Sequence, residues 1–183
     1  MGSMIVWING AFGAGKSTVA AALLERCPQL RLFDPEYVGY VLREFVDVPT
    51  GDFQDLRLWR SLTVEFMDGL LREYGGSLVA PMSVLDSAYR AEIHGGLRER
   101  GYQLHQVILT VPAQTLRERI DGQVELRSAA TWRKERIDRA VRELYGLCDI
   151  EPDTIEIAND RDPAEVATEI AARLGLATRT TIG

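Results

Sequence analysis

Residues 4–17 read MIVWINGAFGAGKS, and the rest of the chain can be interpreted from this stretch. Residues 4–9 are almost wholly apolar, as expected of a strand that is buried on both faces of a parallel sheet. Residues 10–17 match the pattern G-x-x-x-x-G-K-[ST], which is typical of a phosphate-binding P-loop. A helix is expected to begin at about Ser17 and to run to Arg26. The pattern therefore has a buried strand before it and a helix after it, as a phosphate loop requires.

Each residue type in this loop has a physical reason to be there. Glycines let the backbone curl so that successive N–H groups point into one concavity, and the helix that follows adds the positive end of its dipole. Lys16 can reach the β- and γ-phosphates, and the Ser17 hydroxyl can ligate Mg²⁺. The alternative is a tight strand-to-helix turn with a surface lysine. We favour ATP and Mg²⁺ as ligands, with nucleotide contacts from Gly10, Ala11, Phe12, Gly13, Ala14, Gly15, Lys16, Ser17 and Thr18.

Strands and helices alternate along the remaining chain. Further strands are expected at residues 30–33, 77–82, 103–111 and 154–158, and helices at 36–45, 53–74, 87–100, 112–120, around 137–144 and from Asp162 to about Gly175. In the longest of these helices one apolar stripe is expected, formed by Leu56, Trp59, Leu62, Phe66, Leu70 and Tyr74. Gly95-Gly96 weakens the prediction of the helix at 87–100. The alternation predicts an α/β fold of three layers, a parallel sheet with helices on both faces, in one domain over residues 4–176.

Composition and charge restrict the possible partners. The chain has 183 residues, a formal net charge of -6 and a pI of about 5.0, so a nucleic-acid partner is not expected. Cys27 and Cys148 match neither a metal-binding spacing nor a disulfide framework, which fits the reducing cytoplasm. No apolar run has membrane-spanning length and no signal peptide precedes the first strand. We expect a small-molecule ligand and no membrane partner.

The sequence contains one aspartate at the end of the expected second strand and none at the end of the third. Asp34 could accept a proton from an attacking hydroxyl or hold Mg²⁺ through water, or it could simply cap the helix after Pro35. The third strand ends without a carboxylate before Asp86, so Mg²⁺ would rely on Ser17, phosphates, water and Asp34 or Asp86. The apolar end of that strand, at Met82, could then contact an acceptor molecule.

Arginines are concentrated between residues 115 and 142. Arginine side chains stabilise the charge that spreads over a phosphoryl group during transfer. Residues 121–131 interrupt this run and could close over the site as a lid. We expect at least two of these arginines to reach phosphates and select Arg127, Arg136 and Arg139 as catalytic candidates beside Lys16 and Asp34. The alternative is an exposed helix whose arginines pair with neighbouring acids.

Other residues carry weaker signals. Arg43 and Arg60 lie on the helices between the second and third strands, where an acceptor could bind, but both could also be solvated. Trp59 fits the core better than a stacking platform. His94 and His105 have no partner at catalytic spacing, so no role is assigned to them.

Several motifs together resemble one family. These are the loop 5–16 (IVWINGAFGAGK), Asp34-Pro35-Glu36, Asp52-Phe53-Gln54 with Leu58-Trp59-Arg60, Pro81-Met82 and Ile137-Asp138-Arg139. They resemble the bacterial tunicamycin-resistance proteins, relatives of nucleotide and antibiotic kinases, over residues 4 to about 174. The form Trp-Ile-Asn-Gly-Ala-Phe is far more specific than a P-loop pattern alone.

The resemblance implies a P-loop NTPase fold with a five-stranded sheet of order 2-3-1-4-5 and a mobile lid. It also implies a site for a uridine-containing antibiotic beside the ATP site. On this analogy Arg119 and Asn159 lie near the adenine, and the second ligand contacts Asp34, Arg43, Trp59, Arg60 and Met82. The chain ends at Gly183 without the basic amphipathic extension that could hold a relative on a membrane, so we expect a freely soluble protein.

Three functions fit these observations. The first is a phosphotransferase that moves the γ-phosphoryl group of ATP to a hydroxyl of tunicamycin or a similar nucleoside compound. The second is a protein that sequesters the antibiotic with little turnover. The absence of a carboxylate at the end of the third strand favours this second function over the first. The third is a housekeeping kinase for a nucleotide or small metabolite. The arginines near the expected lid favour the first and the third.

Overall fold

A computed structural model describes residues 2–122, 130–151 and 153–179. Five strands form one parallel sheet in the order β2-β3-β1-β4-β5, as predicted. The strands are β1 (Met4–Gly10), β2 (Leu30–Leu32), β3 (Ser77–Pro81), β4 (Gln103–Thr110) and β5 (Thr154–Ala158). Since all strands are parallel, their carboxyl ends lie at one edge of the sheet, where ligands bind in open α/β sheets.

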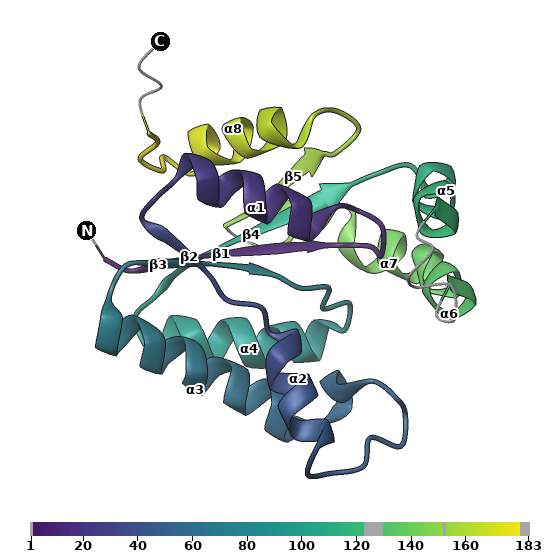
Figure 1. The fold of residues 1–183 in the computed structure, drawn as a ribbon, viewed down its shortest axis with the longest axis horizontal. Helices are drawn as coiled ribbons and strands as arrows, with labels where there is room; N and C mark the ends of the chain where they lie inside the picture. Colours follow the sequence, from purple (N-terminus) through teal and green to yellow (C-terminus); the bar gives the residue numbers. More distant parts are fainter. Residues whose placement is uncertain (1, 123–129, 152, 180–183) are drawn as a thin grey trace.

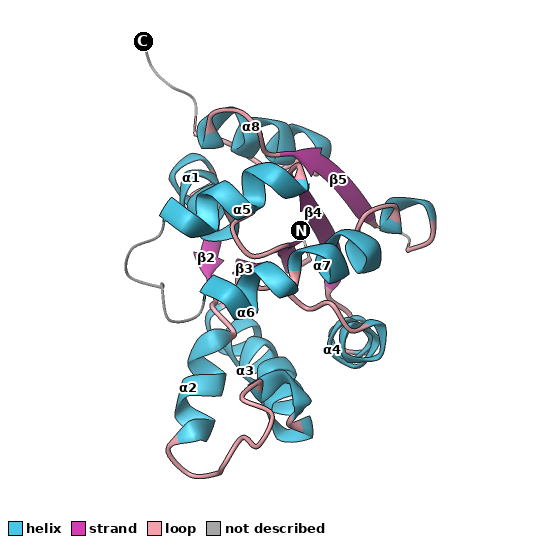
Figure 2. Ribbon diagram, turned by 90° about the vertical axis from the view of Figure 1, so that its right-hand side faces the viewer, coloured by secondary structure: helices cyan, strands magenta, loops and turns pink. Residues whose placement is uncertain are grey.

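Helices cover both faces of this sheet (Figure 1). They are α1 (Lys16–Arg26), α2 (Glu36–Arg43), α3 (Arg57–Tyr74), α4 (Ser87–Glu99), α5 (Ala113–Gly122), α6 (Ala130–Glu135), α7 (Ile137–Leu144) and α8 (Pro163–Arg173). Helices α1 and α8 lie on one face, and α3 and α4 lie on the other. Helices α5, α6 and α7 lie together beyond the carboxyl edge and are nearest the viewer in Figure 2.

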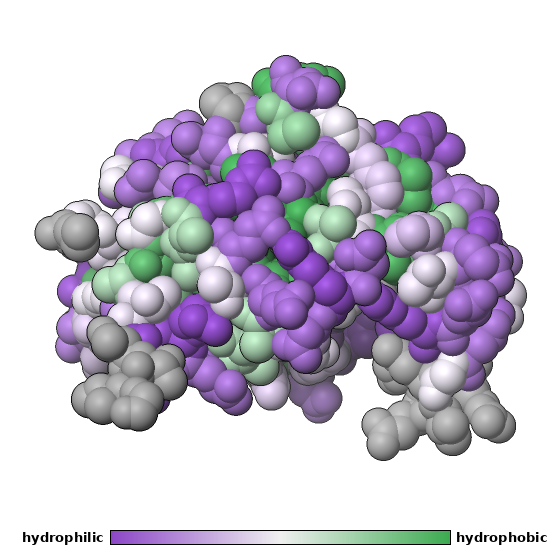
Figure 3. All heavy atoms as spheres, turned by 90° about the horizontal axis from the view of Figure 1, so that it is seen from above, coloured by the Kyte–Doolittle hydropathy of each residue, from purple (hydrophilic) through white to green (hydrophobic). Residues whose placement is uncertain are grey.

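Two hydrophobic cores, one on each face of the sheet, explain why residues 4–8 of β1 are apolar. Val6 and Ile8 belong to the core under α1 and α8, whereas Ile5 and Trp7 belong to the core under α3 and α4. All four side chains are fully buried. Alternate residues of a strand point to opposite faces, so a central strand covered on both faces needs an uninterrupted apolar run. The outer surface of the α1 and α8 layer is mainly hydrophilic (Figure 3).

The region predicted as one helix at 53–74 is divided in the structure. A short 3-10 helix spans Phe53–Asp55, Leu56 is extended, and α3 begins only at Arg57. The predicted apolar stripe of α3 is only partly buried: Trp59 belongs to the core and Leu56 and Leu70 pack against it, but Leu62, Phe66 and Tyr74 are exposed. The buried face of α3 carries Trp59, Arg60, Thr63, Val64, Met67 and Leu71.

The buried face of α3 packs against α4. A Cβ on Gly96 would lie 3.3 Å from Cγ1 of Val64, so the glycine lets the two helices approach closely on the Val64 side. Gly95 and Gly96 do not interrupt α4, which runs from Ser87 to Glu99. The helix propensity of these residues is thus overridden by packing. Among the described residues, no helix is long and apolar enough to span a membrane.

Candidate functional site: the P-loop and its cavity

The P-loop is shaped by glycines with left-handed backbone conformations. Gly13 has φ of 81° and Gly15 has φ of 85°, and Gly15 immediately precedes α1. The first hydrogen bond of α1 joins the N–H of Val19 to the carbonyl of Gly15. The N–H groups of the preceding helical residues therefore have no partner within the helix, and in the described chain no side chain caps this end. Such a helix end suits an anion.

Lys16 is folded back over the loop. Its Nζ donates hydrogen bonds to the carbonyls of Gly10 at 3.2 Å and Ala11 at 3.0 Å. Burial lowers the pKa of Lys16 to about 8, although the charge of Glu36 opposes this shift. The loop thus presents a cation whose hydration is already reduced beside backbone N–H groups.

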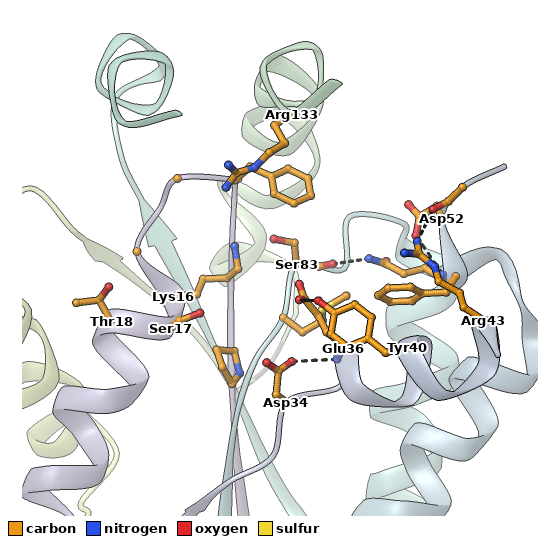
Figure 4. Close-up of a pocket in the computed structure, with 18 residues that line it drawn as sticks. Lys16, Ser17, Thr18, Asp34, Glu36, Tyr40, Arg43, Asp52, Ser83 and Arg133 are labelled. Carbon is orange, nitrogen blue, oxygen red and sulfur yellow. Dashed lines mark hydrogen bonds between the residues drawn. The ribbon is translucent and has the colours of Figure 1, made fainter. Parts of the chain in front are cut away.

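The loop forms one wall of a cavity of about 600 Å³ (Figure 4). The opposite wall comes from the end of β2, from α2 and from the segment that leads to α3. The side chains of Asp34 and Glu36 face Lys16 and Ser17 across this space. The cavity is lined by Phe12, Gly13, Gly15, Lys16, Ser17, Thr18, Asp34, Glu36, Tyr40, Arg43, Gly51, Asp52, Phe53, Gln54, Pro81, Met82, Ser83 and Arg133.

Asp34 both caps a helix and lines the cavity. Its Oδ1 accepts a hydrogen bond from the N–H of Glu36 at 2.9 Å, at the start of α2, and the residue also lines the cavity. Burial raises the pKa of the Asp34 carboxyl, and the nearby Glu36 charge adds to this effect. Capping the helix therefore does not remove Asp34 from the site.

Three arginines of the run after β4 line two neighbouring cavities. Arg133 of α6 lines the cavity, with its guanidinium carbon 5.4 Å from the centroid of the Phe12 ring. Arg136 and Arg139 instead line a smaller neighbouring cavity, where Arg139 lies 3.9 Å from Asp86. Arg136 and Arg139 therefore do not line the cavity that contains Lys16, where Arg133 lies instead.

Two residues predicted near the adenine hold the P-loop from behind. Arg119 donates to the carbonyl of Gly13 at 3.3 Å and to the carbonyl of Asn159 at 3.0 Å. The side-chain amide of Asn159 donates to the carbonyl of Ala14 at 2.5 Å. The loop after β5 and the end of α5 are thus connected to the P-loop by hydrogen bonds.

Comparison with known proteins identifies the family of this chain. The family model described as AAA domain matches residues 5–147. The chain belongs to the AAA-domain family. A search of curated protein sequences finds no match.

Solved structures give a finer comparison for this AAA-domain protein. The tunicamycin resistance protein of Deinococcus radiodurans matches with a TM-score of 0.75 and 29% identity, over 97% of this chain and 99% of that one. This finding confirms the resemblance predicted from the sequence motifs. A gluconokinase from Sinorhizobium meliloti 1021 has a TM-score of 0.63 at 19% identity, over 94% of this chain and 91% of that one.

An APS kinase of Mycobacterium tuberculosis, in complex with AMPPNP and APS, has the same TM-score of 0.63 and identity of 19%, over 94% of this chain and 98% of that one. At this identity the two kinases show the fold alone. The AAA-domain protein therefore has a P-loop small-molecule kinase-like fold and resembles a tunicamycin resistance protein.

Among the residues expected to contact a second ligand, Asp34, Arg43 and Met82 line the cavity, but Trp59 and Arg60 do not. Trp59 is fully buried and its indole N–H donates to the carbonyl of Pro35 at 3.0 Å. Arg60 is also buried, and it is paired with Glu92 at 2.6 Å. Both residues lie behind the wall opposite the P-loop, so neither faces the cavity, contrary to the prediction.

The donor atoms of the cavity fit Mg²⁺. The Ser17 hydroxyl and the carboxylates of Asp34 and Glu36 line the same space, and oxygen is the ligand that Mg²⁺ prefers. Across the described ranges, no group of three or more His, Cys, Asp or Glu could hold a metal by itself. Mg²⁺ in such sites is usually bound by one or two protein oxygens, several waters and phosphate oxygens of the substrate. Asp86 instead caps α4, accepting from the N–H of Ala88.

The main residues that the sequence reasoning missed as site residues are Glu36, Tyr40, Asp52, Gln54, Ser83 and Arg133. Glu36 stands out in the sequence only as part of the motif Asp34-Pro35-Glu36, which does not show that its side chain lines a cavity. Ser83 lies just beyond β3, where the sequence lacks a carboxylate, and its hydroxyl donates to the carbonyl of Gly10 at 2.7 Å. Arg127 and most of the predicted lid at 121–131 lie outside the described residues.

Proposed function

We propose that this protein transfers the γ-phosphoryl group of ATP to a hydroxyl of tunicamycin or of a related uridine-containing compound. One observation carries the proposal: a single cavity has the P-loop with Lys16 on one wall and Asp34, whose pKa is raised, on the opposite wall. The similarity to the Deinococcus tunicamycin resistance protein supports this choice of acceptor.

In the proposed reaction, Lys16 and the N–H groups at the start of α1 bind the β- and γ-phosphate oxygens. The Ser17 hydroxyl would hold Mg²⁺, which would supply charge neutralisation for these oxygens. Asp34 accepts the proton of the acceptor hydroxyl while the new bond from that oxygen to phosphorus forms. The bond from phosphorus to the leaving oxygen breaks, and ADP departs. Arg133 offsets charge on the transferred group.

The remaining site residues have positioning roles in this proposal. Arg119 and Asn159 hold the P-loop on the side assigned to adenine. Arg43 and Met82 form part of the acceptor wall. Met82 is fixed there by its own backbone, since its carbonyl accepts from the indole N–H of Trp7 at 3.0 Å.

A second candidate is sequestration of the antibiotic without turnover. It is supported by the end of β3, where Pro81, Met82 and Ser83 line the cavity and no carboxylate does. A third candidate is a kinase for a nucleotide or small metabolite, since the cavity with Arg133 and the P-loop does not require an antibiotic.

Mass spectrometry of tunicamycin incubated with the protein and Mg-ATP tests these candidates. One added phosphate on the drug supports transfer, and bound but unmodified drug supports sequestration. Asp34→Asn is the matched variant, because an amide oxygen can still accept from the N–H of Glu36. It should abolish transfer and leave ATP affinity unchanged. Full transfer by Asp34→Asn would exclude Asp34 as the base. In a separate assay, ADP formation with nucleoside monophosphates but not with tunicamycin would support the third candidate.

A further inference from the structure

The two walls of the cavity carry opposite charge. Lys16 and Arg133 lie on the side of the phosphates, and the backbone at the start of α1 adds positive potential there. Across the cavity, Asp34, Glu36 and Asp52 supply carboxylates. A ligand that spans the cavity therefore meets a positive and a negative region.

The negative wall contains one cation among its described residues, Arg43. Its guanidinium donates to the carbonyl of Gly51 at 2.8 Å and lies 5.2 Å from the centroid of the Phe53 ring. These contacts hold Arg43 against the wall. Three carboxylates and one guanidinium leave the wall with net negative charge, which repels a phosphate or carboxylate on the acceptor.

Glu36 is the best-placed of these carboxylates to act on an acceptor. It lies opposite Lys16, and the Tyr40 hydroxyl donates to its Oε2 at 2.7 Å (Figure 4). This hydrogen bond is the main cause that raises the pKa of Tyr40 to about 12. Glu36 is therefore held in place as an acceptor for hydroxyl groups.

The rest of the wall suits an uncharged, flat molecule. Met82 and Phe53 supply apolar surface, and the rings of Tyr40 and Phe53 pack edge to face with centroids 6.4 Å apart. Aromatic and apolar side chains of this kind commonly line sites for planar ligands.

We propose that the acceptor carries hydroxyl groups and no phosphate or carboxylate, and that Glu36, oriented by Tyr40, enforces this choice. The inference rests on the proposed function, because it takes this wall as the acceptor site. It adds a selection rule: a nucleoside-like compound is accepted and its phosphorylated form is rejected.

Calorimetric binding of uridine and of uridine monophosphate to protein saturated with AMPPNP and Mg²⁺ tests the rule. The wild type should bind uridine at least about tenfold more tightly than the monophosphate. Glu36→Gln should reduce this preference at least about tenfold. Tyr40→Phe should weaken uridine binding while the monophosphate remains excluded, because the charge of Glu36 is kept. Glu44→Gln, which removes an exposed carboxylate from the end of the same helix, is the control and should change neither affinity.

Equal or tighter binding of the monophosphate by the wild type overturns the rule, as does the same loss of preference in Glu44→Gln. Binding of neither probe also overturns it. Failure of the proposed function gives a different result: uridine binds with the expected preference, yet no phosphate is transferred to tunicamycin.

Discussion

Gly15 and Asn159 are fitted to each other. A Cβ on Gly15 would lie 2.7 Å from Nδ2 of Asn159, and that nitrogen is hydrogen-bonded to the carbonyl of Ala14, the residue before Gly15. Gly15 also has a φ of 85°, which side-chain-bearing residues rarely adopt. Position 15 therefore excludes a side chain both by space and by backbone conformation.

Gly15→Ala should consequently weaken ATP binding by at least about a hundredfold. The new methyl must displace Asn159 or rotate the backbone, and either change moves the N–H groups that start α1. Such a displacement is expected to cost a few kcal/mol. Titration of the variant with AMPPNP and Mg²⁺ measures the loss.

Gly101→Ala is the control for backbone strain alone. Gly101 has a φ of 87°, and a Cβ added there would meet nothing within 4 Å, so this change adds similar strain without the contact. It should lower the free energy of unfolding by about 1 kcal/mol and leave ATP affinity intact. Equal ATP affinities of Gly15→Ala and Gly101→Ala would contradict the claim that contact with Asn159 excludes a side chain at position 15.

ATP affinity should also fall as the pH rises above about 8. Burial lowers the pKa of Lys16 to about 8, so its ammonium is charged below this pH and loses its proton above it. Phosphate binding then requires uptake of a proton, and the dissociation constant should rise by up to about tenfold per pH unit. Calorimetry in two buffers with different ionisation enthalpies measures both affinity and proton uptake.

Lys16→Ala completes this experiment. The substitution should weaken the binding free energy of the nucleotide by about 2–4 kcal/mol near neutral pH, because it removes a charged hydrogen-bond donor. Any residual binding should no longer depend on pH above about 8. Unchanged ATP affinity in this variant would refute the role assigned to the lysine.

The sheet could be predicted from the sequence because its signals are local. The apolar run of β1 and the P-loop pattern identify a central parallel strand. The start of α8 is equally local: its predicted capping residue, Asp162, accepts from the N–H of Ala164 at 2.8 Å. The face of α3 could not be predicted in the same way. The buried face includes Val64, which packs closely against Gly96 of α4, and this contact joins residues that are distant in sequence.

The P-loop and Asp34 could be located in the sequence, but the cavity wall around them could not. Glu36 and Tyr40 lie one turn apart on α2, and only the folded arrangement shows that this face meets the P-loop. Likewise, the arginine run could not show which member faces Phe12. That depends on the separate directions of α6 and α7, which place Arg133 and Arg139 in different cavities.

His94 should make the fold sensitive to acid. The residue is buried in α4 against Trp7, with ring centroids 5.1 Å apart, and burial lowers its pKa from 6.5 to about 3. Between these pH values the unfolded chain binds a proton that the folded protein does not. The free energy of unfolding should therefore decrease as the pH falls below about 6.5, by up to roughly 1.4 kcal/mol per unit.

Urea unfolding at about pH 7 and about pH 5 measures this dependence. His94→Gln should show a smaller decrease between the two pH values than the wild type, because the titrating group is gone. His105→Gln, which changes the other histidine, should keep the decrease of the wild type. An identical decrease in His94→Gln and the wild type would show that other groups cause the acid sensitivity.

Arg133 should matter for phosphoryl transfer more than any arginine of α7. It lines the cavity with Lys16, and its guanidinium lies over Phe12 of the P-loop, whereas Arg142 is exposed and lies 3.7 Å from its neighbour Glu143. Because an arginine that offsets charge in the transition state contributes about 10³-fold or more, Arg133→Ala should reduce turnover by about 10²–10³-fold. Arg142→Ala should change it less than about twofold. Turnover is measured as phosphate added to the acceptor, and thermal unfolding checks that both variants are folded. Full turnover by folded Arg133→Ala would refute the role assigned to Arg133 in offsetting the charge of the transferred group.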